Sequence, residues 1–319
     1  MSCSTGQHLI GIDVGGTNLR LALISADGRI HGRIRMESRI DEGRSAFCDR
    51  LLHGIAEMKT LADTLGVKIS GIGAGIPGLI GHDGIIRSSV NMRPLDGFNP
   101  AAFIADQTGI IAVCANDANV IALGEYAYGA GRNFESMIVL TLGTGLGSGL
   151  ILEKRLWTGL DGFASEFGHV TVEPDGYPCT CGNHGCLEQY VSAGAIVREA
   201  GRRMNTIPAN IDAAAVAKLA KTGNNAALVA FEQAGIRLGQ ALASLVNTLN
   251  IELVILCGGV SGSLDLILPA LKQELDRRCF QEMQQRLKIT GGSLGDDAGL
   301  LGAVHLALSA ASQPPCYSS

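Results

Sequence analysis

LIGIDVGGTNLRLALI, residues 9–24, consists of two apolar runs joined by a short turn of glycine and threonine. MIVLTLGTGLGSGLIL, residues 137–152, has the same pattern, and Gly15 aligns with Gly143 when the two stretches are compared at a constant offset. Apolar runs of strand length on either side of a glycine turn predict a β-hairpin in each stretch. The repeat favours a duplicated domain in which each copy begins with such a hairpin, although two unrelated hairpins would show the same pattern.

Strands alternate with helices along the rest of the chain. The spacing of apolar residues predicts strands at 68–78, 109–117 and 252–259 and helices at 44–65 and 225–249. Another helix follows the strand at 109–117, with Asp117 at its N-cap position, and the last helix begins near Asp296. Strands that alternate with helices in this way indicate an α/β fold.

The composition limits the classes of protein that need to be considered. The 319 residues are 46% hydrophobic and 17% charged, which is enough for two domains with large cores. A net charge of −5 without Lys/Arg runs argues against a nucleic-acid partner. The longest apolar stretches have the length of strands, so neither a transmembrane helix nor a membrane partner is expected. MSCSTGQHLIGID reaches the first strand within eight residues, which leaves no room for a signal peptide.

The number and distribution of the cysteines indicate the redox state of the cellular compartment. The chain has nine of them, an odd number, and most are scattered inside apolar runs. This usage favours a reducing cytoplasm, with buried thiols and one metal cluster, over a framework of disulfides.

Three glycine turns that follow strands are candidates for phosphate binding. A phosphate group needs several backbone N–H groups at close range, and glycine lets the backbone approach because it has no Cβ. The turns contain Gly15, Gly16 and Thr17, then Gly143, Thr144 and Gly145, and finally Gly258 and Gly259. Asp13 lies just before the first turn, where it could meet a metal ion on the phosphates. Together the three turns favour a nucleotide-binding cleft. Because the Walker lysine pattern is absent, this cleft is not expected to be that of a P-loop NTPase.

Several motifs together carry a family resemblance. They are D-V-G-G-T at 13–17, N-D at 116–117, T-L-G-T-G at 141–145, E-F-G-H at 166–169, C-x-C-G-x-x-G-C-L-E at 179–188 and C-G-G at 257–259. In this order they resemble the ROK family of bacterial sugar kinases and repressors, within the sugar kinase/actin superfamily, and most closely its glucokinase members. The resemblance implies an α/β fold of the two-domain, actin-like (ribonuclease H-like) kind, with a nucleotide and sugar cleft between the domains. It also implies a homodimer.

The resemblance implies domain boundaries as well. Residues 1–116 would form a small N-terminal α/β domain that carries the first phosphate loop and part of the sugar site, and the C-terminal helix 297–312 would join it. Residues 117–296 would form a larger α/β domain with the nucleotide site and a zinc-binding loop, whose ligands are described below.

Site roles follow from the same motifs. The first phosphate loop would comprise Asp13, Gly15, Gly16 and Thr17, the second Gly143, Thr144 and Gly145, and Gly258 and Gly259 would lie beside the nucleotide. The sugar would be held by Gly78, Asn91, Asn116, Asp117, Glu166, His169 and Glu188, with Asp117 as the catalytic base. After Asn91 the chain reads V-N-M-R-P-L-D-G-F at 90–98, where the commoner pattern is P-N-L followed shortly by Trp. This departure affects the expected shape of the sugar pocket.

One histidine and three cysteines are candidates for a metal site. His169, Cys179, Cys181 and Cys186 supply one nitrogen and three sulfur ligands, which is a complete tetrahedral set for Zn²⁺. The spacing and the family pattern favour zinc over unrelated buried thiols, and the absence of C-x-x-C weighs against thiol exchange. Four protein ligands leave no open position, so the metal is expected to be structural. It would hold the loop that bears Glu166 and Glu188.

The resemblance implies ATP-dependent phosphorylation of a hexose at the C6 hydroxyl, with Mg²⁺ accompanying ATP. Glucose is the expected substrate and glucose 6-phosphate the product, in cytoplasmic carbohydrate metabolism and glycolysis. The altered loop leaves N-acetylglucosamine, N-acetylmannosamine or another hexose as alternative substrates. A sugar-sensing repressor is a further alternative, but only twelve residues precede Asp13, fewer than a DNA-binding domain needs. An actin-like assembly protein would have no need of a cysteine zinc loop.

Overall fold

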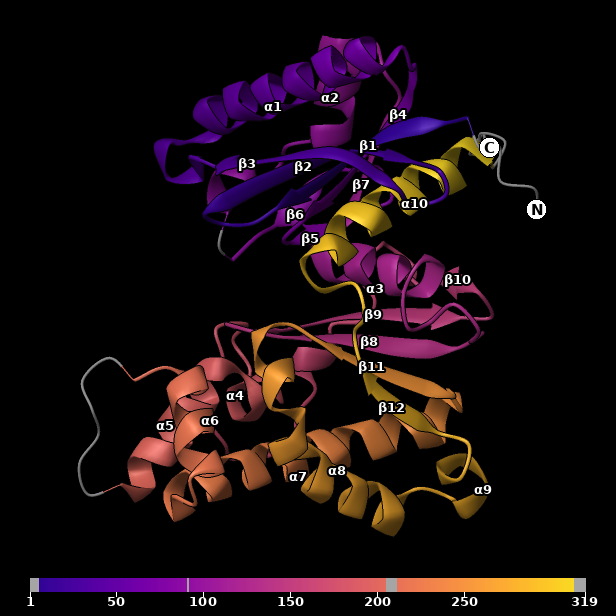
Figure 1. The fold of residues 1–319 in the computed structure, drawn as a ribbon. Helices are drawn as coiled ribbons and strands as arrows, with labels where there is room; N and C mark the ends of the chain where they lie inside the picture. Colours follow the sequence, from indigo (N-terminus) through magenta and orange to yellow (C-terminus); the bar gives the residue numbers. More distant parts are fainter. Residues whose placement is uncertain (1–5, 91, 205–210, 313–319) are drawn as a thin grey trace.

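The computed structural model describes residues 6–90, 92–204 and 211–312, and its N-terminal hairpin lies at the centre of a five-stranded sheet (Figure 1). The strands are β1 (His8–Val14), β2 (Asn18–Ser25), β3 (Ile30–Glu37), β4 (Ile69–Ile76) and β7 (Ala112–Asn116). Their order is β3-β2-β1-β4-β7, in which β1 is antiparallel to β2 and parallel to β4. Helices α1 (Arg44–Leu65) and α2 (Pro100–Thr108) cover one face of this sheet (Figure 1).

A second five-stranded sheet repeats the topology of the first. It contains β8 (Met137–Leu142), β9 (Leu146–Leu152), β10 (Arg155–Leu156), β11 (Leu253–Cys257) and β12 (Lys288–Gly291). The order is β10-β9-β8-β11-β12, again an antiparallel hairpin whose first strand pairs in parallel with the next strand of the sheet. The two predicted hairpins are therefore confirmed, and each occupies the same position in its own sheet.

Helices cover the second sheet on the face turned away from the first sheet (Figure 1). They are α4 (Glu188–Val191), α5 (Ala193–Arg203), α6 (Ala213–Lys221), α7 (Asn225–Leu249), α8 (Leu264–Arg278) and α9 (Gln281–Gln284). Helix α7 packs against α8 and α5 through a hydrophobic core that also contains residues of β8 and β11. The small strands β5 (Leu79–Ile80) and β6 (Ile86–Ser88) form a separate hairpin.

Two helices lie between the sheets. Helix α3 (Asp117–Ala127) follows β7 directly, and α10 (Ala298–Ser312) packs against the first sheet although it comes last in the chain (Figure 1). Glycines permit this close packing, since a Cβ at Gly73 of β4 would lie 1.8 Å from the carbonyl oxygen of Ala303. A Cβ at Gly302 would lie 1.7 Å from the carbonyl oxygen of Val120, so α3 and α10 meet backbone to backbone. This contact places the N-terminus of α3 at the junction of the two sheets.

The expected helices at 44–65 and 225–249 are confirmed, and one detail of the sequence analysis is corrected. The N-cap of α3 is Asn116 instead of Asp117, because the Asn116 side chain accepts hydrogen bonds from the N–H groups of Ala118 and Asn119. Among the described residues, no helix combines the length and the apolar character needed to cross a membrane.

Candidate functional site

The first glycine turn joins β1 to β2 and is held by hydrogen bonds to its backbone. The N–H of Gly15 donates to the carbonyl oxygen of Asn18 at 2.7 Å. Ser38 fixes the other side, where its hydroxyl donates to the Gly16 carbonyl at 2.7 Å and its N–H to the Thr17 carbonyl at 2.9 Å. A Cβ at Gly16 would meet no atom of the described residues within 4 Å. The turn is thus ordered by hydrogen bonds and is open on the side of Gly16.

Asp13 lies at the end of β1 with its carboxylate buried. It is 8% exposed and forms an ion pair with Arg20, which faces it across the hairpin. Burial raises the pKa of Asp13, and the guanidinium of Arg20 opposes that rise. Gly299, near the start of α10, comes so close that a Cβ there would lie 2.9 Å from the Asp13 carboxyl carbon. The carboxylate therefore stands where β1, β2 and α10 converge.

The second glycine turn joins β8 to β9 and contacts Glu188. The N–H of Gly143 donates to the Gly145 carbonyl at 3.0 Å, and the Gly143 carbonyl accepts from Ala193 N–H at 2.9 Å. The Glu188 carboxylate accepts from the N–H of Leu146 at 2.9 Å, and a Cβ at Gly145 would lie 2.5 Å from it. A side chain at 145 would displace this carboxylate, so glycine there allows an acid expected at the sugar to contact a candidate phosphate loop.

The third glycine pair lies beside the second turn because β11 pairs with β8. Gly258 has φ +87°, and a Cβ there would lie 2.4 Å from the carbonyl oxygen of Leu142. A cavity of about 250 Å³ opens next to Gly259. Its lining is mostly small or apolar, with two lysines: Ala213, Ala214, Ala217, Lys218, Lys221, Phe231, Gly259, Val260, Gly262 and Ser263. No sequence motif indicates the α6 part of this cavity, since a run of alanines and lysines is common in helices.

Asn116 connects the end of β7 to the small hairpin. Its side-chain amide donates to the Gly78 carbonyl at 3.1 Å while its oxygen caps α3. Gly78 has φ +131°, and a Cβ there would lie 2.7 Å from the carbonyl oxygen of Ser88, so the position requires glycine. The structure thus brings Gly78 and Asn116 together as expected, whereas Asn91 lies outside the described residues.

Asp117, the first residue of α3, has the properties of a general base. Burial raises its pKa to about 6, and the negative charges of Asp13 and Glu166 add to that rise. The hydrogen bond from the N–H of Ala118, 3.0 Å from the Asp117 carboxylate, acts in the opposite direction. A base whose pKa lies near neutral pH is both largely ionised and still able to take a proton.

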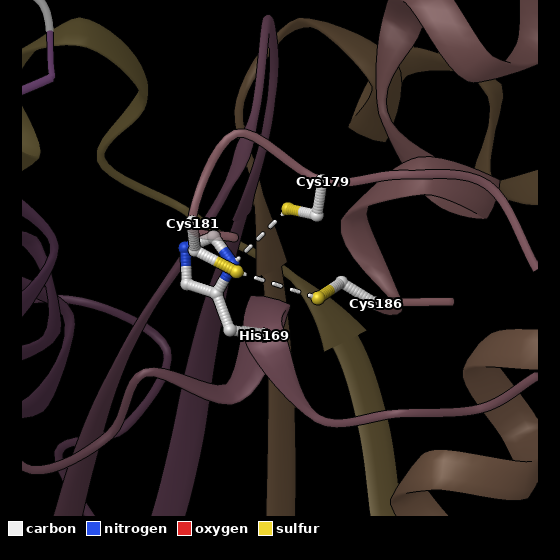
Figure 2. Close-up of side chains that lie close together, drawn as sticks. All are labelled: His169, Cys179, Cys181 and Cys186. Atoms are coloured by element: carbon white, nitrogen blue, oxygen red, sulfur yellow. Dashed lines mark hydrogen bonds between the residues drawn. The ribbon is translucent and has the colours of Figure 1, made fainter. Parts of the chain in front are cut away.

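The four expected metal ligands come together in one cluster, shown in Figure 2. The ligand atoms of His169, Cys179, Cys181 and Cys186 all lie within 4.8 Å of one another. The Nδ1 of His169 is 3.6 Å from the sulfur of Cys179, and the sulfurs of Cys181 and Cys186 are 3.6 Å apart. Zn–S bonds of about 2.3 Å in a tetrahedron separate two sulfurs by roughly 3.8 Å, so these spacings fit such an ion.

Two glycines allow the chain to wind around the cluster. Gly182 and Gly185 have φ of +94° and +68°. A Cβ at Gly185 would lie 1.6 Å from the carbonyl oxygen of Glu173, a distance that no side chain tolerates. The positive φ at both positions therefore favours glycine, and the close approach of the Glu173 carbonyl requires it at 185.

His169 connects the cluster to the acids. While its Nδ1 faces the sulfurs, its Nε2 lies 4.0 Å from the carboxylate of Glu166. Glu166 keeps 47% of its side chain exposed, but partial desolvation still raises its pKa; the charge of His169 opposes the rise, and the nearby Glu188 adds to it. Asp117, Glu166 and Glu188 thus form one group of acids that act on one another electrostatically, between the glycine turns and the metal ligands.

The comparisons with known proteins agree with this arrangement. The ROK family pattern matches residues 9–310. The chain belongs to the ROK family. The glucokinase of Thermotoga maritima is 32% identical over 310 residues, which cover 93% of this chain and 96% of that protein. The xylose repressor of Bacillus subtilis is 29% identical, over 92% of this chain and 75% of the repressor.

A solved ROK structure matches the fold over almost its whole length. It is a ROK family glucokinase from Streptomyces griseus in complex with glucose and AMPPNP, with a TM-score of 0.79 and 30% identity. The match covers 95% of this chain and 99% of that one. The expected α/β fold of the actin-like (ribonuclease H-like) kind is thereby confirmed.

Sequence reasoning missed two kinds of residue in this ROK site. Arg20 was overlooked although the hairpin pattern contains the signal, because Asp13 and Arg20 are opposite charges at paired positions of β1 and β2. The contacts of the two residues that flank Glu166 were also missed. The hydroxyl of Ser148 in β9 binds Ser165 and Phe167, and the hydroxyls of Ser148 and Ser165 meet only in the folded chain.

Proposed function

We propose that this ROK protein transfers the γ-phosphate of ATP to the C6 hydroxyl of glucose. Its family membership, its similarity to the Thermotoga maritima glucokinase and its similarity to a structure that contains glucose and AMPPNP support ATP-dependent glucose phosphorylation. The observation that carries the proposal most directly is Asp117, a half-buried carboxylate with a pKa of about 6 at the N-terminus of α3, among ordered glycine turns.

In the proposed mechanism Asp117 takes the proton of the reacting hydroxyl. The freed oxygen then attacks the γ-phosphorus in line with the leaving oxygen of ADP. Backbone N–H groups of the turns at Gly16 and Gly143 would hold the phosphates. Mg²⁺ bound to ATP would neutralise phosphoryl charge, and the buried carboxylate of Asp13 would orient its hydration shell.

The sugar would lie between Gly78 and Asn116 on one side and the acids on the other. Glu166 and Glu188 would accept hydrogen bonds from ring hydroxyls, and His169 would add one through Nε2, the ring nitrogen that faces Glu166. Asn91 is proposed as a further sugar ligand. Once the bound sugar covers them, polar groups that pair with its hydroxyls would discriminate against sugars that leave them unpaired.

The nucleotide would extend from the glycine turns toward the third pair, with Thr17 and Thr144 in the two phosphate loops. Gly15 and Gly145 shape these loops, and Gly258 brings the β11 backbone against the second one. The cavity beside Gly259 would accept the base, since it is lined by small and apolar side chains. Lys218, exposed on α6 at this cavity, would attract the phosphates electrostatically.

Zinc is proposed as the metal of the cluster. Three sulfurs and one nitrogen are the donors that Zn²⁺ prefers, and a full protein ligand set indicates a structural role. The ion would stabilise the loop from His169 to Cys186, and through Glu166 and Glu188 it would hold the sugar site in shape.

The domain organisation and context complete the proposal. Residues 1–116 with 297–312 would form one domain and residues 117–296 the other, and the contact of α10 with the first sheet supports this division. We further propose a homodimer that acts in the cytoplasm, where glucose 6-phosphate enters glycolysis.

A sugar panel tests the function. Purified protein is assayed for ADP release with ATP and glucose, mannose, fructose, allose, N-acetylglucosamine or N-acetylmannosamine, and Asp117→Asn serves as the matched inactive control. Glucose should have the highest kcat/KM. An advantage of about tenfold for another sugar, or about 1.4 kcal/mol of transition-state binding, would reassign the substrate and leave the kinase activity standing. Absence of ADP release with every sugar would contradict the kinase itself.

A further inference from the structure

A buried serine contacts the loop that carries Glu166. Ser148 lies in β9, is 5% exposed and has its hydroxyl directed at residues 165–167. This hydroxyl donates to the carbonyl oxygen of Ser165, contacts the Ser165 hydroxyl at 3.2 Å and accepts from the N–H of Phe167 at 3.1 Å. One side chain therefore binds the residue before Glu166 and the residue after it.

The backbone at Ser165 needs such support. Its φ of +72° places a residue other than glycine in the left-handed region, which is a strained conformation for such a residue. A strained conformation persists only where surrounding contacts determine it. Here the contacts with Ser148 hold Ser165 in this conformation. The conformation of Ser165 in turn sets the direction in which the side chain of the next residue, Glu166, points.

The position of β9 makes this contact relevant to the site. Gly147 and Gly149 flank Ser148 and face α3, where a Cβ at 147 would lie 3.0 Å from the Ala118 Cβ and one at 149 would lie 2.5 Å from the Ala122 Cβ. Side chains alternate between the faces of a strand, so Ser148 points to the opposite side. One short segment of β9 thus bears α3, which begins with Asp117, on one face and the Glu166 loop on the other.

We propose that Ser148 and Ser165, here called the serine pair, are positioning residues that hold Glu166 in register with Asp117 for sugar recognition. The inference rests on the proposed function, because Glu166 is a sugar ligand only if the protein binds a hexose. Because the Ser148 hydroxyl is engaged by Ser165 and Phe167, the serine pair would act on the sugar through Glu166 and not by direct contact. Its loss should therefore affect sugar binding more than ATP binding.

The first test is Ser148→Ala, which removes the shared hydroxyl and leaves the Phe167 N–H and the Ser165 carbonyl without it. The KM for glucose should rise about tenfold, as expected for a lost sugar contact of about 1.4 kcal/mol, while the KM for ATP stays within about twofold. Ser25→Ala is the matched control, since Ser25 is 6% exposed and hydrogen-bonded but lies in β2. It should lower the melting temperature without changing either KM.

A double-mutant cycle distinguishes positioning from general destabilisation. If Ser148 acts through Glu166, Ser148→Ala should change the glucose KM much less in a Glu166→Gln background than in the wild type. Equal effects in both backgrounds would overturn the proposal. So would a folded Ser148→Ala protein with wild-type glucose KM, or one in which both KM values rise together.

Ser165→Gly keeps the inference testable if Ser148→Ala fails to fold. Glycine accepts φ of +72° without strain, so this variant should be at least as stable as the wild type. It lacks the second hydroxyl and frees the backbone before Glu166, so the glucose KM should still rise severalfold. An unchanged glucose KM in this variant would overturn the proposal that the serine pair positions Glu166. Activity of the wild type on the sugar panel is read first, so that failure of the kinase proposal is seen separately.

Discussion

Replacing Asp117 with asparagine should abolish most of the activity and at the same time stabilise the protein at neutral pH. The side chain keeps its size and its oxygen still accepts the hydrogen bond from Ala118, but it can no longer take a proton. Turnover should fall by roughly 10²–10⁴, the usual scale for the loss of a general base. The affinities for ATP and glucose should change little.

The gain in stability follows from the raised pKa. Burial, with help from the charges of Asp13 and Glu166, moves the pKa of Asp117 from 3.8 to about 6. A raised carboxyl pKa means that the folded state prefers the protonated form. Stability is therefore full below the unfolded value and is lost as pH rises through the folded one. Since one pKa unit corresponds to about 1.4 kcal/mol, the cost of ionised Asp117 is about 1 kcal/mol at about pH 4.5 and about 3 kcal/mol at about pH 8.

Urea unfolding of wild type and variant at these two pH values measures the effect. The advantage of Asp117→Asn should grow by about 2 kcal/mol between about pH 4.5 and about pH 8. Asp106→Asn is the control, because Asp106 is an exposed acid of α2 and its replacement should have no such pH dependence. A variant that gains nothing at the higher pH would refute the buried, ionised carboxylate. Retained turnover would move the base elsewhere, with Glu166 the next candidate.

Three further predictions concern the metal, the pH profile and a buried anchor. Chelator-washed protein should contain about one zinc per chain by elemental analysis, and Cys186→Ser should lose it; metal-free protein with full activity and unchanged melting would contradict the site. The kcat/KM for glucose should fall as pH drops through about 6 because Asp117 must be ionised, and a flat profile down to about pH 5 would speak against it. Glu125→Gln should cost roughly 2–4 kcal/mol in urea unfolding, because the fully buried carboxylate accepts N–H groups from Ala130, Ser293 and Leu294. Glu135→Gln, at an exposed ion pair with Lys154, should change the free energy of unfolding far less, because solvent screens exposed pairs.

Much of the fold could be read from local patterns. The hairpins around Gly15 and Gly143, the helices 44–65 and 225–249 and the metal ligands were all recognisable, because each depends on residues close together in the chain. The spacing of His169, Cys179, Cys181 and Cys186, together with the family pattern, predicted a metal cluster, and the structure brings the four candidate ligand atoms within 4.8 Å of one another. Local spacing and side-chain chemistry alone decide such features.

Contacts between distant segments were decided only by the tertiary structure. The N-cap of α3 is Asn116 because its side chain oxygen, held by the Gly78 contact, reaches two N–H groups. Glu188 contacts the second glycine turn although it follows Leu146 by 42 residues in the chain, so only the folded chain brings the two together.

The same limit applies to pKa values and to the serine pair. Burial raises the pKa of Asp117 to about 6, and burial exists only after α3, β9 and the first sheet have packed together. Ser148 and Ser165 are ordinary polar residues in the sequence, and nothing in their spacing indicates that their hydroxyls meet. A sequence determines which groups are present and how the nearby ones pattern into strands and helices, whereas distances across the fold determine what those groups do.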